Sequence, residues 1–162
     1  MAGPRVGILM GSRSDMPVME KASALLTELG VEHEVRVMSA HRTPALVAGY
    51  ATGAADRGLG VVVAAAGGAA HLAGVVAAHT LLPVIGVPIA TQLAGGLDSL
   101  LSTVQMPRGV PVATVSVGGA ENAALLAAEI LALGDPDLRS RLVAFRERQA
   151  RAILEDETNR GG

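Results

Sequence analysis

The segment Ser39–Pro44, with the sequence SAHRTP, places a histidine directly before an arginine. Histidine has an unperturbed pKa of about 6.5, so His41 can both donate and accept a proton near neutral pH. The guanidinium of Arg42 can hold a phosphate through two parallel hydrogen bonds. The pairing favours His41 as the catalytic residue and Arg42 as an anion-binding residue, although a lone loop histidine can also be structural.

The segment Gly11–Asp15, GSRSD, has two hydroxyl groups at the start of a predicted helix. Free N–H groups and the helix dipole make helix N-termini suitable for binding anions. Asp15 is a poor phosphate contact because it is acidic, and it suits a ribose hydroxyl better. The alternative is that Ser14 and Asp15 only cap the helix. The segment matches neither the dinucleotide-binding glycine pattern nor the Walker phosphate loop.

A third segment, residues 66–71 with the sequence AGGAAH, is rich in small residues and ends in His71. Small residues leave room for a flat ligand and let backbone N–H groups point at it. This favours Gly67, Gly68 and His71 as substrate-binding residues. The alternative is close packing of a helix on a sheet, with His71 buried against a backbone partner. We interpret His33 and His79 as structural.

Short apolar runs alternate with stretches of helical periodicity along the whole chain. The runs predict strands over Arg5–Met10, His33–Met38, Gly60–Ala66, Pro83–Val87 and Pro111–Val115. The periodic stretches predict helices over Met16–Leu29, Pro44–Arg57, Ala70–His79, Asp98–Val104 and about Glu121–Leu133.

Strands that are apolar throughout and separated by helices predict a parallel sheet covered on both faces. With right-handed crossovers, this gives an α/β, flavodoxin-like, three-layer doubly wound domain. Ligands of such sheets bind beyond the carboxyl ends of the strands, where the three segments above should lie. The whole of residues 1–158 is expected to form this one domain, with a frayed tail at 159–162.

An additional C-terminal helix is predicted over about 136–155, opened by Asp135-Pro136-Asp137. Its apolar positions form a stripe that could pack on the same domain or on a neighbouring copy. We interpret its arginine-rich face as solvated. The stripe is formed by residues 138, 142, 145, 152 and 153, and the arginines stand at 139, 141, 146, 148 and 151.

The composition restricts the function classes. Apolar residues make up 50% of the 162 residues and charged residues only 17%, so we expect part of the surface to be buried in a homo-oligomer. A net charge of −2 without a basic cluster argues against a nucleic-acid partner. The absence of cysteine excludes thiolate chemistry and Cys-ligated metals. We expect neither a signal peptide nor a membrane span, and hence a cytoplasmic protein.

At these loops the chain resembles the class I PurE family. The motifs are GSRSD at 11–15, SAHRTP at 39–44, AGGAAHLAG at 66–74, PVIGVP at 83–88 and GGLDSLLSTVQMPRGVPVATV at 95–115, followed by ENAALLAAEILAL at 121–133. The related class II enzymes typically have lysine after the histidine and a different segment in place of AGGAAHL. Arg42 and the intact AGGAAHL therefore point to class I.

The resemblance implies that N5-carboxyaminoimidazole ribonucleotide is converted to 4-carboxy-5-aminoimidazole ribonucleotide in purine biosynthesis, with CO2 as a trapped intermediate. It implies an octamer, no cofactor and no metal. It makes His41 the general acid and base, and it assigns substrate contacts to Ser12, Asp15 and Arg42, with Ser14 and Ser39 helping to bind the phosphate.

Three alternatives remain open at this stage. A class II carboxylase would add CO2 directly to aminoimidazole ribonucleotide. A flavin electron carrier shares the fold, but the aromatic residues Tyr50 and Phe145 both lie in predicted helices. A phospho-receiver module needs a lysine late in the chain, whereas the only lysine is Lys21.

Overall fold

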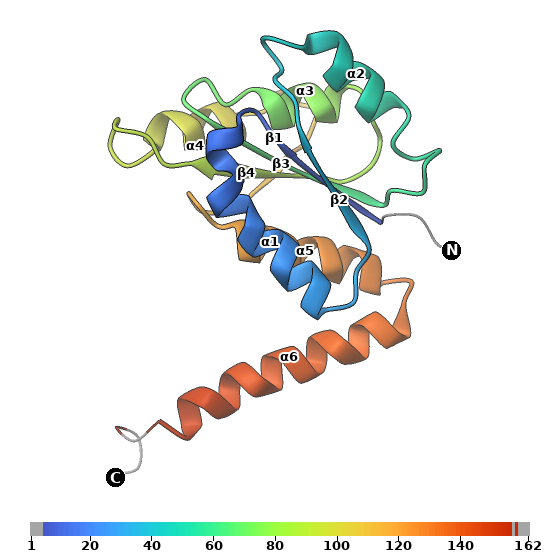
Figure 1. Ribbon diagram of the computed structural model, residues 1–162, viewed down its shortest axis with the longest axis vertical. Coiled ribbons are helices and arrows are strands. Elements are labelled where there is room, and N and C mark those ends of the chain that lie inside the picture. Colours follow the sequence, from blue (N-terminus) through green and yellow to red (C-terminus); the bar gives the residue numbers. More distant parts are fainter. Residues whose placement is uncertain (1–4, 157, 159–162) are drawn as a thin grey trace.

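The computed structural model describes residues 5–156 and 158, so the predicted tail at 159–162 lies outside the described residues. The sheet is parallel, with the strand order β2-β1-β3-β4-β5 (Figure 1). The strands are β1 (Val6–Met10), β2 (His33–Val37), β3 (Val61–Gly67), β4 (Val84–Ile89) and β5 (Ala113–Thr114). The helices are η1 (Arg13–Asp15), α1 (Met16–Glu28), α2 (Pro44–Thr52), α3 (Leu72–Ala78), α4 (Leu97–Val104), α5 (Ala120–Ala132) and α6 (Pro136–Leu154).

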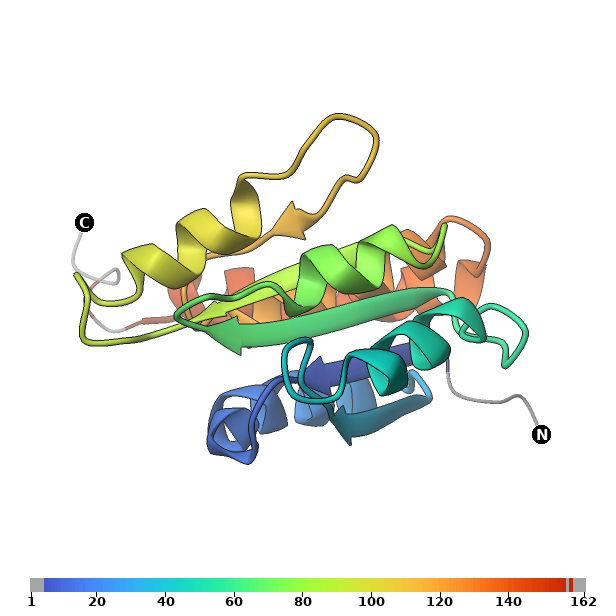
Figure 2. The same ribbon diagram turned by 90° about the horizontal axis from the view of Figure 1, so that it is seen from above.

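Helices cover both faces of the sheet. Helices α2, α3 and α4 lie on one face, and α1 and α5 lie on the other (Figures 1 and 2). Each face has its own apolar core, because alternate residues of the buried strands point to opposite sides. Ile8 of β1 belongs to the core under α1 and α5, and the next residue, Leu9, belongs to the core under α2 and α3. The three-layer doubly wound α/β prediction is confirmed.

The carboxyl ends of β2, β1 and β3 lie at the same edge of the sheet, with β3 extending two residues further, to Gly67. Met10, the last residue of β1, pairs with Val37 on one side and with Ala65 on the other. Because all three strands are parallel, the loops that follow them leave the same edge of the sheet. The three segments singled out in the sequence are therefore brought together there.

Helix α4 packs unusually close to the sheet. A Cβ atom built on Gly86 of β4 would lie 2.3 Å from Cγ2 of Thr103, so only glycine fits at this position. Thr103 is buried, and its hydroxyl donates to the carbonyl of Ser99 one turn earlier. This contact fixes α4 against β4.

Three elements are clearly shorter than predicted, and one of them is α3, which spans Leu72–Ala78 and not Ala70–His79. The helix predicted over Pro44–Arg57 ends at Thr52, and Gly53 begins a series of turns. The strand predicted over Pro111–Val115 pairs with β4 only at Ala113–Thr114. Proline has no N–H to donate to the ladder, and an edge strand has one neighbour only, which accounts for the short β5.

Helix α6 packs on its own domain at its beginning and projects from the body further along (Figure 1). Leu138 and Leu142 are buried, and Phe145 packs against the same core, whereas Ala152 and Ile153 are exposed. The arginine-rich face is exposed, as predicted. Three of its arginines also contact the body: the Arg141 guanidinium donates to the Leu29 carbonyl at 2.7 Å, Arg146 forms an ion pair with Glu129, and Arg148 forms one with Glu28.

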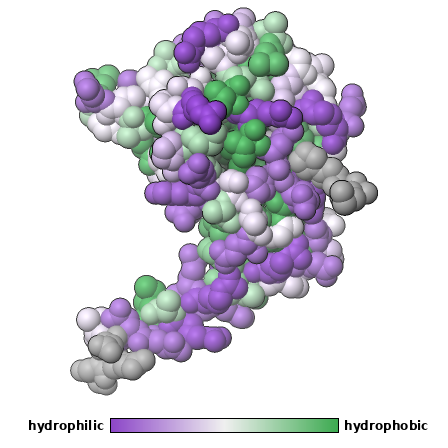
Figure 3. Space-filling model, in the orientation of Figure 1, coloured by the Kyte–Doolittle hydropathy of each residue, from purple (hydrophilic) through white to green (hydrophobic). Residues whose placement is uncertain are grey.

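The surface alternates between polar and apolar areas. On the face shown in Figure 3, hydrophilic side chains dominate the projecting helix α6, and hydrophobic patches gather on the body. Helix α4 carries an exposed apolar row, Leu97, Leu101 and Val104, at helical spacing. Within the described part of the chain, no helix combines the length and the apolar character needed to span a membrane.

Candidate active site

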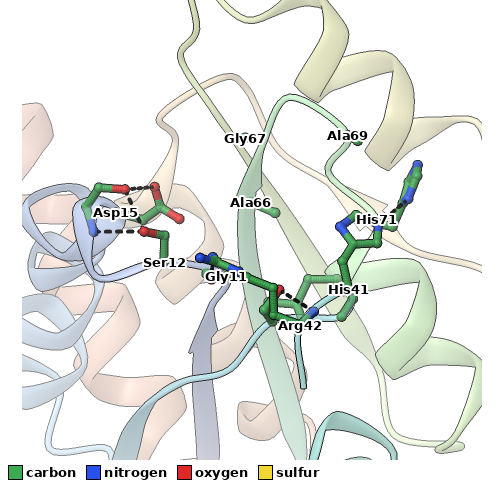
Figure 4. Close-up of a pocket in the computed structure, with 13 residues that line it drawn as sticks. Gly11, Ser12, Asp15, His41, Arg42, Ala66, Gly67, Ala69 and His71 are labelled. Carbon is green, nitrogen blue, oxygen red and sulfur yellow. Dashed lines mark hydrogen bonds between the residues drawn. The ribbon is translucent and has the colours of Figure 1, made fainter. Parts of the chain in front are cut away.

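A cavity of about 230 Å³ opens where the loops after β1, β2 and β3 meet (Figure 4). Strand β1 lies between the other two, so its loop forms the floor and the flanking loops form the walls. Every site residue predicted from the sequence lines this cavity except Gly68. The lining residues are Gly11, Ser12, Ser14, Asp15, Ser39, Ala40, His41, Arg42, Ala66, Gly67, Ala69, His71 and Leu72.

Two histidines from different loops are hydrogen-bonded at one side of the cavity. Nε2 of His41 lies 2.8 Å from Nδ1 of His71, and the two rings are nearly perpendicular, at 81°. One of these nitrogens donates and the other accepts, so the bond couples the protonation of one ring to the tautomer of the other. His71 therefore stands beside the proposed proton carrier, and the alternative of a buried structural histidine is wrong, because His71 is exposed to the cavity.

His33 contrasts with this pair. Its Nδ1 lies 2.9 Å from the Val31 carbonyl, and its Nε2 lies 2.7 Å from the Ser23 hydroxyl. Both ring nitrogens are used to join β2 to α1, away from the cavity. The structural interpretation of His33 is confirmed.

Arg42 spans the middle of the cavity between two loops. Its guanidinium Nη2 donates to the Gly11 carbonyl at 3.0 Å, and its backbone N–H donates to the Ser39 hydroxyl at 3.1 Å. Thr43 in turn accepts a bond from the Ser39 N–H and donates to the Ser39 carbonyl. Because a guanidinium has five N–H donors, Arg42 can hold its place through Gly11 and still offer donors to an anion.

Asp15 lies at the opposite side of the cavity from the histidines (Figure 4). Its side chain is buried, and this burial raises the pKa of the carboxyl group, while hydrogen bonds from the Ser14 side chain and the Ser12 backbone oppose the change. Asp15 stands at the N-cap position of α1, as the capping alternative proposed, but its side chain makes no capping bond. Ser12 caps the preceding η1, where its hydroxyl accepts the Ser14 N–H.

Gly68 is not among the residues that line the cavity. Its N–H donates to the Ser99 hydroxyl at 2.8 Å, so this backbone group does not point at a ligand as the sequence suggested. Its neighbours Gly67 and Ala69 line the cavity. Gly68 has φ of +65°, a left-handed conformation that favours glycine.

Several residues of the cavity wall were not predicted from the sequence. Ala40, Ala66, Ala69 and Leu72 line the cavity without any polar side chain to draw attention to them. Their signal was positional, because each lies within two residues of a predicted site residue. Ser99 left no comparable signal, since it is 31 residues from Gly68 in the chain.

The aromatic residues do not contribute to the cavity lining. The Tyr50 hydroxyl donates to Glu34 at 2.8 Å, and the Arg57 guanidinium lies over the Tyr50 ring. Burial, together with the adjacent Glu34 carboxylate, raises the pKa of the Tyr50 hydroxyl. Phe145 packs on the core under α6. The stacking partner that the flavin alternative needs is thus not supplied by either ring.

A doubly wound α/β domain that gathers a histidine pair, an arginine, an aspartate and several serines around one cavity at the carboxyl edge of its sheet has the arrangement of an enzyme active site. The chain belongs to the AIR carboxylase family, whose model matches residues 5–152. The crystal structure of Treponema denticola PurE superposes with a TM-score of 0.88 at 33% identity, covering 98% of this chain and 99% of that one. The resemblance to PurE and the flavodoxin-like fold are thereby confirmed.

Relatives with assigned names cover most of the chain. The N5-carboxyaminoimidazole ribonucleotide mutase of Mycobacterium tuberculosis strain H37Rv is 61% identical over 93% of this chain and 86% of its own length. The protein of the same name from Thermotoga maritima is 53% identical over 94% of this chain and 89% of its own length. The chloroplastic phosphoribosylaminoimidazole carboxylase of Vigna aconitifolia is 54% identical over 93% of this chain, which spans 27% of that longer protein.

Proposed function

We propose that the chain is an N5-carboxyaminoimidazole ribonucleotide mutase of purine biosynthesis. The observation that carries the proposal is the His41–His71 pair at one side of a cavity whose other walls carry serines, an aspartate and an arginine. The names of the relatives at 53–61% identity support the same reaction.

His41 carries the proton in this mechanism. The substrate holds a carbamate on its exocyclic nitrogen. Protonation of that nitrogen by His41 breaks the N–C bond and leaves aminoimidazole ribonucleotide and CO2. The ring is then an enamine, whose carbon C4 attacks the same CO2 to form the new C–C bond. His41, now neutral, removes the C4 proton, so that the ring regains its aromaticity and His41 its starting charge.

The remaining side chains bind and orient the nucleotide. The phosphate is bound by donors from Arg42, Ser14 and Ser39. Asp15 accepts a hydrogen bond from a ribose hydroxyl, and Ser12 also contacts the nucleotide. These contacts lie away from the reacting ring, and their binding energy orients it toward His41. Every step uses groups of this chain and the substrate, so the mechanism requires neither a cofactor nor a metal.

CO2 has to stay in place between the two steps. Gly67, Ala69 and His71 line the cavity on the side of His41. A wall of small residues keeps CO2 beside C4, and recapture then becomes effectively unimolecular. This makes CO2 a trapped intermediate rather than a free co-substrate.

The decisive assay offers two substrate sets to the purified chain. One is N5-carboxyaminoimidazole ribonucleotide without bicarbonate, and the other is aminoimidazole ribonucleotide with bicarbonate. Rapid formation of the 4-carboxy product from the first set supports the mutase. Efficient conversion of the second set alone would establish a class II carboxylase, the candidate that the name of the Vigna relative favours.

The assembly and location belong to the same proposal. We expect a homo-octamer in the cytoplasm, acting on a small nucleotide and not on nucleic acid. The exposed apolar row on α4 supports self-association, because single domains seldom leave such rows uncovered.

A further inference from the structure

The backbone of Gly68 is held from behind by helix α4. Ser99 accepts the Gly68 N–H at 2.8 Å, and the Ser102 hydroxyl shares its one proton between the Asp98 carbonyl at 2.6 Å and the Gly68 carbonyl at 3.2 Å. Neither serine lines the cavity. The bond from the Gly68 N–H to Ser99 holds this peptide unit, and the longer contact between Ser102 and the Gly68 carbonyl adds to it.

This restraint reaches the cavity through the neighbours of Gly68. Gly67 and Ala69, on either side of it, both line the cavity, and His71 follows two residues later. Gly68 has the left-handed φ of +65°, which glycine adopts without strain, and because glycine can adopt many other conformations its contacts with α4 help to select this one. A change in the Gly68 backbone would therefore move the wall beside His41.

Helix α4 is itself well anchored. Asp98 accepts from the Thr91 hydroxyl at 2.6 Å and from the Ser99 N–H at 2.9 Å, which fixes the first turn to the preceding loop. The close contact of Thr103 with Gly86 fixes the second turn to β4. Ser99 is fully buried between these two anchors.

We propose that Ser99 and Ser102 are positioning residues that hold the Gly67–His71 wall closed around CO2. This inference rests on the proposed mutase function. Ser99 has the larger effect, because its removal leaves the Gly68 N–H without its acceptor. Ser102 has the smaller effect, because the Ala70 N–H also donates to the Gly68 carbonyl.

The test measures whether the carboxyl carbon of the substrate is retained in the product. The full-length chain converts substrate labelled with 13C in the carbamate, in the presence of excess unlabelled bicarbonate, and mass spectrometry measures the label in the product. We expect the unmodified chain to retain the label. Ser99→Ala should raise the lost fraction roughly tenfold, as expected when a backbone donor loses its acceptor, and should release aminoimidazole ribonucleotide. Ser102→Ala should lie between the two.

Thr103→Val is the matched control. It removes a buried hydroxyl from the same helix, keeps the methyl group that contacts Gly86, and leaves both bonds to Gly68 in place. It should retain the label even if its unfolding temperature falls as far as that of Ser99→Ala. Equal label retention in Ser99→Ala, Ser102→Ala and Thr103→Val would overturn the inference. If Ser99→Ala does not fold, label retention is compared between Ser102→Ala and Thr103→Val, and equal retention in these two variants would overturn the inference.

The two proposals can fail separately. If the unmodified chain forms no 4-carboxy product from the carbamate substrate, the mutase function is wrong. If it forms that product and Ser99→Ala retains the label, the function stands and the positioning role is wrong.

Discussion

His41 and His71 share a hydrogen bond that allows two arrangements of protons. Either His41 donates through Nε2 and His71 accepts, or the roles are reversed. A general acid must hold its proton at the nitrogen that faces the substrate, and a bond from a second imidazole can set that choice. Arg42 and Asp15, in contrast, are placed to bind rather than to react.

Substitution should separate catalysis from binding. His41→Asn should lower turnover by roughly 10²–10⁴-fold with little change in substrate affinity, because it removes a general acid and base. Arg42→Ala should raise KM by about 10- to 100-fold, because it removes charge-assisted hydrogen bonds to phosphate. Steady-state kinetics and calorimetric binding measure both effects. Equal loss of turnover with unchanged binding in the two variants would contradict this division of roles.

The raised pKa of Asp15 predicts how the stability of the folded chain depends on pH. Burial favours the neutral carboxyl, so the carboxylate present at pH 7 destabilises the folded state. Asp15→Asn should therefore raise the unfolding temperature at pH 7, and this gain should shrink as the pH falls through the pKa of Asp15. Thermal unfolding between pH 3 and 8 measures it, with Asp56→Asn in an exposed turn as the control. A gain that grows toward acid pH would have the wrong sign. The same variant should bind substrate more weakly.

At the scale of elements, the strands and most helices could be predicted because buried parallel strands are apolar throughout. The end of α2 could not be predicted, because the helical pattern of the sequence continues to Arg57. In the structure the helix ends earlier, and the Arg57 guanidinium lies over the Tyr50 ring. The convergence of the three loops could be predicted, because the strands were expected to be parallel. The hydrogen bond from Gly68 to Ser99 could not be predicted, because a contact between a hydroxyl and a distant backbone N–H leaves no periodic pattern in a sequence.

Helix α6 should contribute to stability through its first turns. Leu138 is fully buried, so Leu138→Ala should destabilise the fold by about 2–5 kcal/mol through lost contacts and a cavity. Leu133, just before this helix, is 90% exposed, and Leu133→Ala should change stability by less than about 0.5 kcal/mol. Chemical denaturation of both variants measures the difference. Similar losses in the two would show that the start of α6 does not pack as described.

At the scale of the whole molecule, exposed large apolar side chains are spread over several elements. Besides the row on α4, Leu46, Leu81 and Leu93 are exposed. These residues lie on several elements, so they suit contacts with more than one neighbour. The proposed octamer would account for the low charged fraction of 17%.

The assembly can be measured directly. Sedimentation at micromolar concentration should give one species with the mass of eight chains, because the uncovered apolar rows favour association. Leu101→Glu places a charge within the row on α4 and should shift the distribution toward smaller species. A single monomeric species of the unmodified chain would contradict the proposed octamer.

The alignment of β1 between β2 and β3 has a consequence for spectroscopy. His41 follows the end of β2 and His71 follows the end of β3, so the proton between them bridges loops that flank β1. A slip of either outer strand by one residue would displace its loop by about 3.3 Å, more than this bond tolerates. The nuclear magnetic resonance signal of the imidazole proton between His41 and His71 should therefore be lost when β2 or β3 shifts relative to β1.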